Sequence, residues 1–136
     1  PNRVSPGVSD ALVSHIDLFA SMVELVGEDL KEGVAIDSQK RLNSLLGEDK
    51  KGRDYIIEVA QSISISDGEW KYITPCKRTP YYQITRTETG NSPEEQLYNL
   101  RKDIGEKCNL ASENPKKLKE LQGLLELEKE KGFMLK

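Results

Sequence analysis

Three short runs between residues 67 and 111 decide the fold of this chain: Asp-Gly-Glu-Trp-Lys-Tyr-Ile (67–73), Glu-Gln-Leu-Tyr-Asn-Leu (95–100) and Gly-Glu-Lys-Cys-Asn-Leu-Ala (105–111). The first run opens with Asp67-Gly68, a turn dipeptide, and its large apolar side chains predict a strand that leaves the turn. In the second run two leucines flank a tyrosine, which predicts a short half-buried strand over 97–100. Both strands lead into polar turns, so the stretch indicates a small antiparallel sheet.

Further strands are predicted on both sides of the Asp-Gly turn. Residues 55–60 are rich in β-branched and aromatic side chains and suit a central strand. At 63–66 isoleucines alternate with serines, which is typical of a strand with one solvated face. Residues 75–93 contain three prolines and are predicted to form a long excursion from the sheet, with one strand through 82–84.

The first part of the chain has a helical rather than a β pattern. Residues 1–10 are predicted to be extended, and alternation over 11–16 predicts a short strand. Asp17 can cap a helix over 18–26, with Gly27 as its terminator. This segment is therefore expected to place one amphipathic helix early in the chain.

Two more helices are predicted. The Asp-Ser pair at 37–38 can cap a short helix over 39–46. Near the end, Asn114 can cap a helix that has Pro115 at its first position and ends at Gly132. The apolar stripe of this last helix consists of Leu118, Leu121, Leu125 and, at its margin, Leu124. Such a stripe is expected to pack on the sheet.

Composition and charge exclude some classes of function. The chain has 136 residues with 20 Lys plus Arg against 23 Asp plus Glu, which gives a net charge of −3. A nucleic-acid-binding face needs a basic excess, so no nucleic-acid partner is expected. The longest apolar run, at 18–26, contains Glu24 and is far shorter than the roughly 20 residues of a membrane span, so no membrane partner is expected either.

The order of these segments resembles the C-terminal portion of arylsulfatase-like sulfatases, which belong to the alkaline-phosphatase superfamily. In that family a strand with the pattern gxyKYi is followed by eLYdL..D..E..NLA and a closing helix, and 67–73 and 95–111 are similar in sequence and order. Upstream, 12–19 is similar to the family segment lvs.iDl.PTll.laG, although Ala-Ser at 20–21 replaces its Pro-Thr pair. The resemblance is absent across 75–93.

The resemblance implies an α+β fold: a small antiparallel β-sheet packed against a C-terminal helix, preceded by short helices from the end of an α/β sulfatase domain. It places the tail end of the catalytic domain at 1–50 and the C-terminal subdomain at 51–136. Its implied partners are the remainder of the catalytic domain and an anionic sulfated substrate of the parent enzyme. Members of the family are often secreted, periplasmic or lysosomal.

The resemblance also implies a parent enzyme that hydrolyses sulfate esters with calcium and a formylglycine nucleophile. The nucleophile belongs to a C-x-P-x-R pattern, whereas Cys-Lys-Arg-Thr-Pro at 76–80 has Arg and Pro in the wrong order. We therefore assign no catalytic residue, no metal ligand and no cofactor to this chain. The chain alone is predicted to be inactive, with a role in supporting the fold and the substrate cleft.

The cysteines and the histidine have structural interpretations. Cys76 suits a small apolar position at a strand end, and Cys108 has no expected role beyond packing or a disulfide with Cys76. His15 has no partners at metal-site or triad spacing, and we expect it to be structural.

One set of residues is a candidate for substrate binding. Lys77, Arg78 and Arg86 can bind sulfate or carboxylate, and the rings of Tyr81 and Tyr82 can stack on sugar faces. The alternative interpretation is a solvated loop whose charges have no specific ligand.

Two other functions remain open at this point. The chain could be the C-terminal part of a related phosphonate or phosphodiester hydrolase, or a free-standing binding module without catalysis. A fragment separated from its parent domain should expose an apolar patch over 8–26, because the surface that the parent covers would face water.

Overall fold

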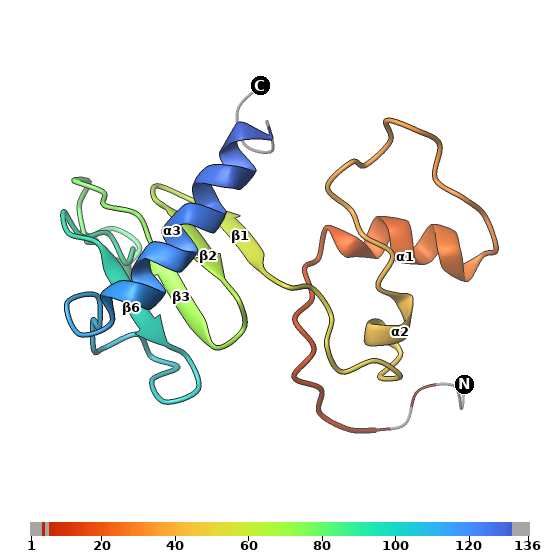
Figure 1. Ribbon diagram of the computed structural model, residues 1–136, viewed down its shortest axis with the longest axis horizontal. Helices are drawn as coiled ribbons and strands as arrows, with labels where there is room; N and C mark the ends of the chain where they lie inside the picture. Colours follow the sequence, from red (N-terminus) through yellow and green to blue (C-terminus); the bar gives the residue numbers. More distant parts are fainter. Residues whose placement is uncertain (1–3, 5, 132–136) are drawn as a thin grey trace. The chain divides into compact units, whose positions relative to one another are not determined.

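The computed structural model describes residue 4 and residues 6–131. The chain forms two compact units, Pro1–Ile56 and Ile57–Lys136, and each is described by itself. The first contains helices α1 (Asp17–Leu25) and α2 (Leu42–Leu45) joined by long loops (Figure 1). The second contains the sheet and helix α3 (Pro115–Glu130). Among the described residues, no helix is both long enough and apolar enough to cross a membrane.

The first unit differs from the sequence predictions at three points. The strand predicted over 11–16 is reduced to a single parallel bridge between Leu12 and Gly52. Asp17 is not the N-cap residue of α1 but its first helical residue, and its side chain accepts hydrogen bonds from Arg53. The second helix is shorter than the predicted 39–46, and its N-cap residue, Arg41, makes no capping hydrogen bond through its side chain. In each case contacts with distant residues override a local pattern.

The second unit is built on a four-stranded antiparallel sheet. Its strands are β1 (Ile56–Val59), β2 (Ile63–Ser66), β3 (Trp70–Ile73) and β6 (Gln96–Asn99), in the order β1-β2-β3-β6. The predicted strands at 63–66, 70–74 and 97–100 are therefore confirmed to within one residue. The strand predicted as central, 55–60, instead lies at the edge of the sheet, and its Val59 is 67% exposed.

The core lies between one face of the sheet and α3 (Figure 1). Ile65, Tyr72 and Leu97 stand opposite one another on three neighbouring strands and form one buried row. From α3, Leu121 and Leu125 are each only 1% exposed, which confirms the predicted apolar stripe. The fold is thus α+β, as the sequence predicted.

Helix α3 begins where the sequence predicted. Asn114 is its N-cap residue and Pro115 its first residue, but the Asn114 side chain makes no capping bond. The predicted end at Gly132 lies outside the described residues. An ion pair of 2.8 Å between Lys117 and Asp67 ties the first turn of α3 to the turn between β2 and β3. Asp67 also accepts the backbone N–H of Trp70 at 2.7 Å, so this carboxylate holds both the turn and the helix.

The 95–111 segment is held by side chains that act as backbone partners. The Asn109 carboxamide oxygen accepts the Leu97 N–H of β6 at 3.0 Å, and the Leu110 N–H donates to the Leu97 carbonyl at 2.8 Å. Asp103 accepts the N–H groups of Lys107 and Cys108 at 2.7 and 2.8 Å. The bonds to Leu97 satisfy part of the outer edge of β6, and the bonds to Asp103 hold the loop that follows, so the motif residues here build the fold.

Candidate functional site

The long excursion at 75–93 contains a small hairpin instead of the single strand predicted over 82–84. Strand β4 (Tyr81–Tyr82) pairs antiparallel with β5 (Thr87–Glu88), and the chain turns between them. Arg86 lies in that turn with a φ of 53°, a left-handed conformation that is uncommon for a residue with a side chain. Ile84, in the same turn, is 99% exposed. The hairpin therefore presents its turn to solvent.

A polar cluster anchors the base of the hairpin. Asn91 is buried, and its side-chain amide donates to the Gln61 side chain at 2.6 Å and to the Thr79 carbonyl at 3.0 Å. The Gln61 amide donates in turn to the Tyr82 hydroxyl. The Cys76 thiol contacts the Gln61 carbonyl at 3.5 Å. Gln61 comes from the β1–β2 turn, so the hairpin is fixed to the sheet at its base while its turn is solvated.

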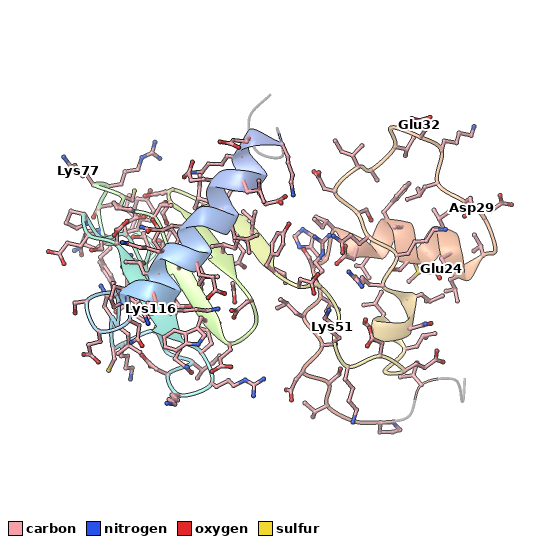
Figure 2. The ribbon with its side chains drawn as sticks, viewed as in Figure 1. Glu24, Asp29, Glu32, Lys51, Lys77 and Lys116 are labelled. Carbon is pink, nitrogen blue, oxygen red and sulfur yellow. The ribbon has the colours of Figure 1, made fainter. Side chains whose placement is uncertain are left out.

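The structure places the five candidate residues on one continuous segment of chain. Tyr81 and Tyr82 are 36% and 44% exposed on β4, and Arg86 follows in the turn. Lys77 and Arg78 are exposed in the segment that leads into β4, and Lys77 projects outward from the second unit (Figure 2). Within the described part of the chain, none of the three basic side chains forms an ion pair. Their charges are available to an anion.

The cysteines and the histidine do not form a reactive group. Cys76 and Cys108 are both free thiols, so the disulfide considered from the sequence is absent. Cys76 lies beside the hairpin base, and Cys108 is exposed in the loop held by Asp103. His15 is exposed in the turn before α1. In residue 4 and residues 6–131, no three His, Cys, Asp or Glu side chains gather as a metal site would require.

The first unit contains a buried ion pair that the sequence analysis missed. Asp17 is fully buried, and Arg53 donates to both of its oxygens, with 2.7 Å between Nε and Oδ2. The same carboxylate accepts the backbone N–H groups of Gln39 at 2.9 Å and Ser14 at 3.2 Å. Arg53 also donates to the carbonyl of Asp37 at 2.7 Å. We call these five residues the Asp17 clamp, which ties α1 to two loops.

The surroundings of Asp17 favour its charged form. Burial by itself raises the pKa of this carboxyl, but hydrogen bonds from Arg53 and from two backbone N–H groups outweigh burial and hold the pKa below its usual value. Asp67 behaves in the same way. Burial raises its pKa, but hydrogen bonds from Lys117 and from the turn N–H groups outweigh burial and hold the pKa below its usual value. Both carboxylates are structural anions, and neither is poised as a general acid or base.

Sequence could have indicated Asp17 but not its partner. An aspartate directly before the apolar run 18–19 needs either a cap role or a buried cation. The cation lies 36 residues away in a charged loop, where nothing in the local pattern distinguishes Arg53 from its neighbours.

Fold and site together define a class of protein: an α+β unit with an anchored aromatic and basic hairpin, in which the described residues assemble no metal centre. Comparison with known proteins shows what the chain is similar to. No family model matches the chain. A curated relative, the N-acetylgalactosamine-6-O-sulfatase of Bacteroides thetaiotaomicron, is 41% identical over 128 residues, which are 93% of this chain and 25% of the relative.

Two solved structures share the fold of this chain. One, from work on the metabolism of multiple glycosaminoglycans by Bacteroides thetaiotaomicron, superposes with a TM-score of 0.84 and 42% identity over 93% of this chain and 27% of its own. A 2-O GAG sulfatase shares the fold at a TM-score of 0.54 and 24% identity, over 81% of this chain and 23% of its own. The chain is homologous to the C-terminal part of sulfatases, and it spans about a quarter of the curated relative's length.

Proposed function

We propose that this chain serves as the C-terminal part of a sulfatase that removes sulfate esters from a sulfated sugar. The observation that carries the proposal is the 41% identity to an N-acetylgalactosamine-6-O-sulfatase across 93% of the chain. The sugar of that relative is the substrate class that we propose here. Residues 1–50 would then be the end of the catalytic domain, and 51–136 the C-terminal subdomain.

In this proposal the chain supplies support and substrate contacts, and the reacting groups lie in the preceding part of the enzyme. The sulfatase resemblance implies calcium and formylglycine there, but the described residues of this chain offer no donor set for the metal. Cys76 lies in the wrong motif and contacts a backbone carbonyl. The chain alone should therefore release no sulfate.

The hairpin is the part of this chain that we propose contacts the substrate. A sulfated sugar presents anions and flat apolar ring faces. Exposed guanidinium and ammonium groups bind such anions, and tyrosine rings stack on such faces. Lys77, Arg78 and Arg86 are exposed and form no ion pair among the described residues, while Tyr81 and Tyr82 are partly exposed beside them. The anchor at Gln61 and Asn91 would hold this surface in place.

A chimera tests the function. The C-terminal quarter of the Bacteroides thetaiotaomicron relative is replaced by this chain, and sulfate release from 6-sulfated N-acetylgalactosamine is measured. We expect an active chimera and an inactive isolated chain. An inactive, folded chimera would refute the proposal. So would sulfate release by the isolated chain that is abolished by Cys76→Ala.

The same chimera tests the hairpin. Losing one charge-assisted hydrogen bond to an anion costs about 1.5–3 kcal/mol, so Arg86→Gln and Arg78→Gln should each raise KM by about 10- to 100-fold. Lys116→Gln, at an exposed position on α3, is the matched control and should leave KM unchanged (Figure 2). Equal kinetics in all three variants would assign the basic residues to a solvated loop.

A further inference from the structure

Helix α1 exposes its large apolar side chains. Four of them and the C-cap residue Val26 are between 44% and 72% exposed: Leu18, Phe19, Met22, Leu25 and Val26. We call these five residues the α1 apolar face. Val8, in the same part of the chain, is 98% exposed, so the apolar patch predicted over 8–26 is present. A surface helix normally turns such side chains toward a core, and a contiguous exposed set marks an interaction site.

The side of α1 that faces its own unit is small and polar. Its buried residues are Asp17, Ala20 and Ser21. The Ser21 hydroxyl accepts the Arg41 N–H at 2.9 Å, and the Ala20 N–H donates to the Ser38 hydroxyl at 2.9 Å. Together with the Asp17 clamp, these bonds hold α1 from its polar side. An ordinary surface helix buries its apolar side and exposes its polar side. Helix α1 does the reverse, because its polar side bonds to its own unit and its apolar side is exposed.

We propose that the α1 apolar face is the surface on which the preceding, catalytic part of the sulfatase packs. This inference rests on the proposed function. The relative is about four times as long as the matched segment, which is its C-terminal quarter, so about three quarters of that enzyme precede it. That part is large enough to cover a helix. The covering surface must be apolar, because Glu24 is the only charged residue of α1 besides the buried Asp17.

The inference predicts that one substitution has different effects in two contexts. In the isolated chain Phe19 is 53% exposed and lies in the first turn of α1, where an added carboxylate interacts favourably with the helix dipole. Phe19→Asp should then leave that chain folded and reduce its binding of a hydrophobic dye. In the chimera the same carboxylate would be buried without a partner. The thermal midpoint should fall by about 5 °C or more, with a parallel loss of folded yield.

Met22→Lys is the second variant, with the opposite charge on the same face, so the result does not depend on the sign of the charge. Ile104→Asp is the matched control, because Ile104 is 83% exposed but belongs to the second unit. We expect both α1 variants to destabilise the chimera and the control to leave it unchanged.

The outcomes separate this inference from the proposed function. A wild-type chimera that is folded but inactive refutes the function. An active chimera in which the two α1 variants behave like Ile104→Asp refutes the docking face. If sedimentation shows that Phe19→Asp dissociates a dimer of the isolated chain while the chimera is unaffected, a second copy covers the face, and the inference is again wrong.

Discussion

Asp17→Asn should destabilise the first unit by about 3–5 kcal/mol, the usual cost of removing one partner from a buried ion pair. The structure explains why an isosteric change is so costly. Every group around the carboxylate is a donor: two from Arg53 and one each from Gln39 and Ser14. An asparagine replaces one acceptor oxygen with an NH₂ group. The new NH₂ group would face N–H donors and could bond to none of them. The buried Arg53 side chain, which is 7% exposed, would also lose its counter-charge.

The clamp can be assayed separately from the sheet. Amide hydrogen exchange in α1 reports the first unit, and the fluorescence of Trp70, the single tryptophan, reports the second. A loss of 3–5 kcal/mol should speed exchange in α1 by about 150- to 4,000-fold, while the Trp70 signal stays unchanged. The control is Asp54→Asn, which breaks an exposed pair with Lys51 and should leave exchange in α1 nearly unchanged, because solvent screens such a pair. Equal exchange in the two variants would refute the reasoning.

A double variant checks that the loss comes from an unpaired charge. Arg53→Met alone should be about as costly as Asp17→Asn, because it leaves a buried carboxylate. Adding Asp17→Leu to Arg53→Met should recover part of that loss, since no charge then remains buried. Recovery should be incomplete because the N–H groups of Ser14 and Gln39 lose their acceptor. A double variant less stable than either single variant would contradict this account.

Three further predictions concern single residues. The pKa of Asp17 in the folded chain lies below the ordinary 3.8, so the stability that Asp17 contributes should be complete above pH 3.8 and lost as the pH falls through the lower folded pKa. Exchange in α1 measured from about pH 5 to pH 2 should show this loss of stability in wild type and not in Asp17→Asn. Gly52→Ala should cost about 1–3 kcal/mol or more in the same assay, because φ is +67° and the new Cβ would clash with the Leu12 backbone. Leu125→Ala should cost the second unit about 2–5 kcal/mol in urea unfolding followed by Trp70, because Leu125 is 1% exposed.

Sequence predicted the second unit well because its signals are local. The Asp67-Gly68 turn, the alternation at 63–66 and the leucine stripe of α3 each fix an element within a few residues. The order of strands could not be read in the same way. Residues 55–60 have the composition of a central strand, yet β1 lies at the edge, because strand order depends on which partners are available.

The candidate site was predicted as a set of residues but not as a structure. Charge and aromatic content singled out Lys77, Arg78 and Arg86 with their neighbouring tyrosines. The anchor that fixes the hairpin, Gln61 with Asn91, joins residues 30 positions apart and carries no local signature. Polar residues in loops look alike in sequence whether they are solvated or buried. Their roles depend on contacts that only the fold supplies.

The first unit shows how amphipathicity can mislead. The apolar spacing at 18–26 predicts a helix correctly, and its apolar side is exposed as predicted for a fragment, although such a side ordinarily faces the unit's own core. A second signal for this exposure lies in the other residues of the helix. Asp17, Ala20 and Ser21 fall on one side, and small and hydrogen-bonding side chains allow close backbone approach. A helix with one polar and one apolar packing side is expected to have a neighbour on each. The first unit provides a neighbour only for the polar side.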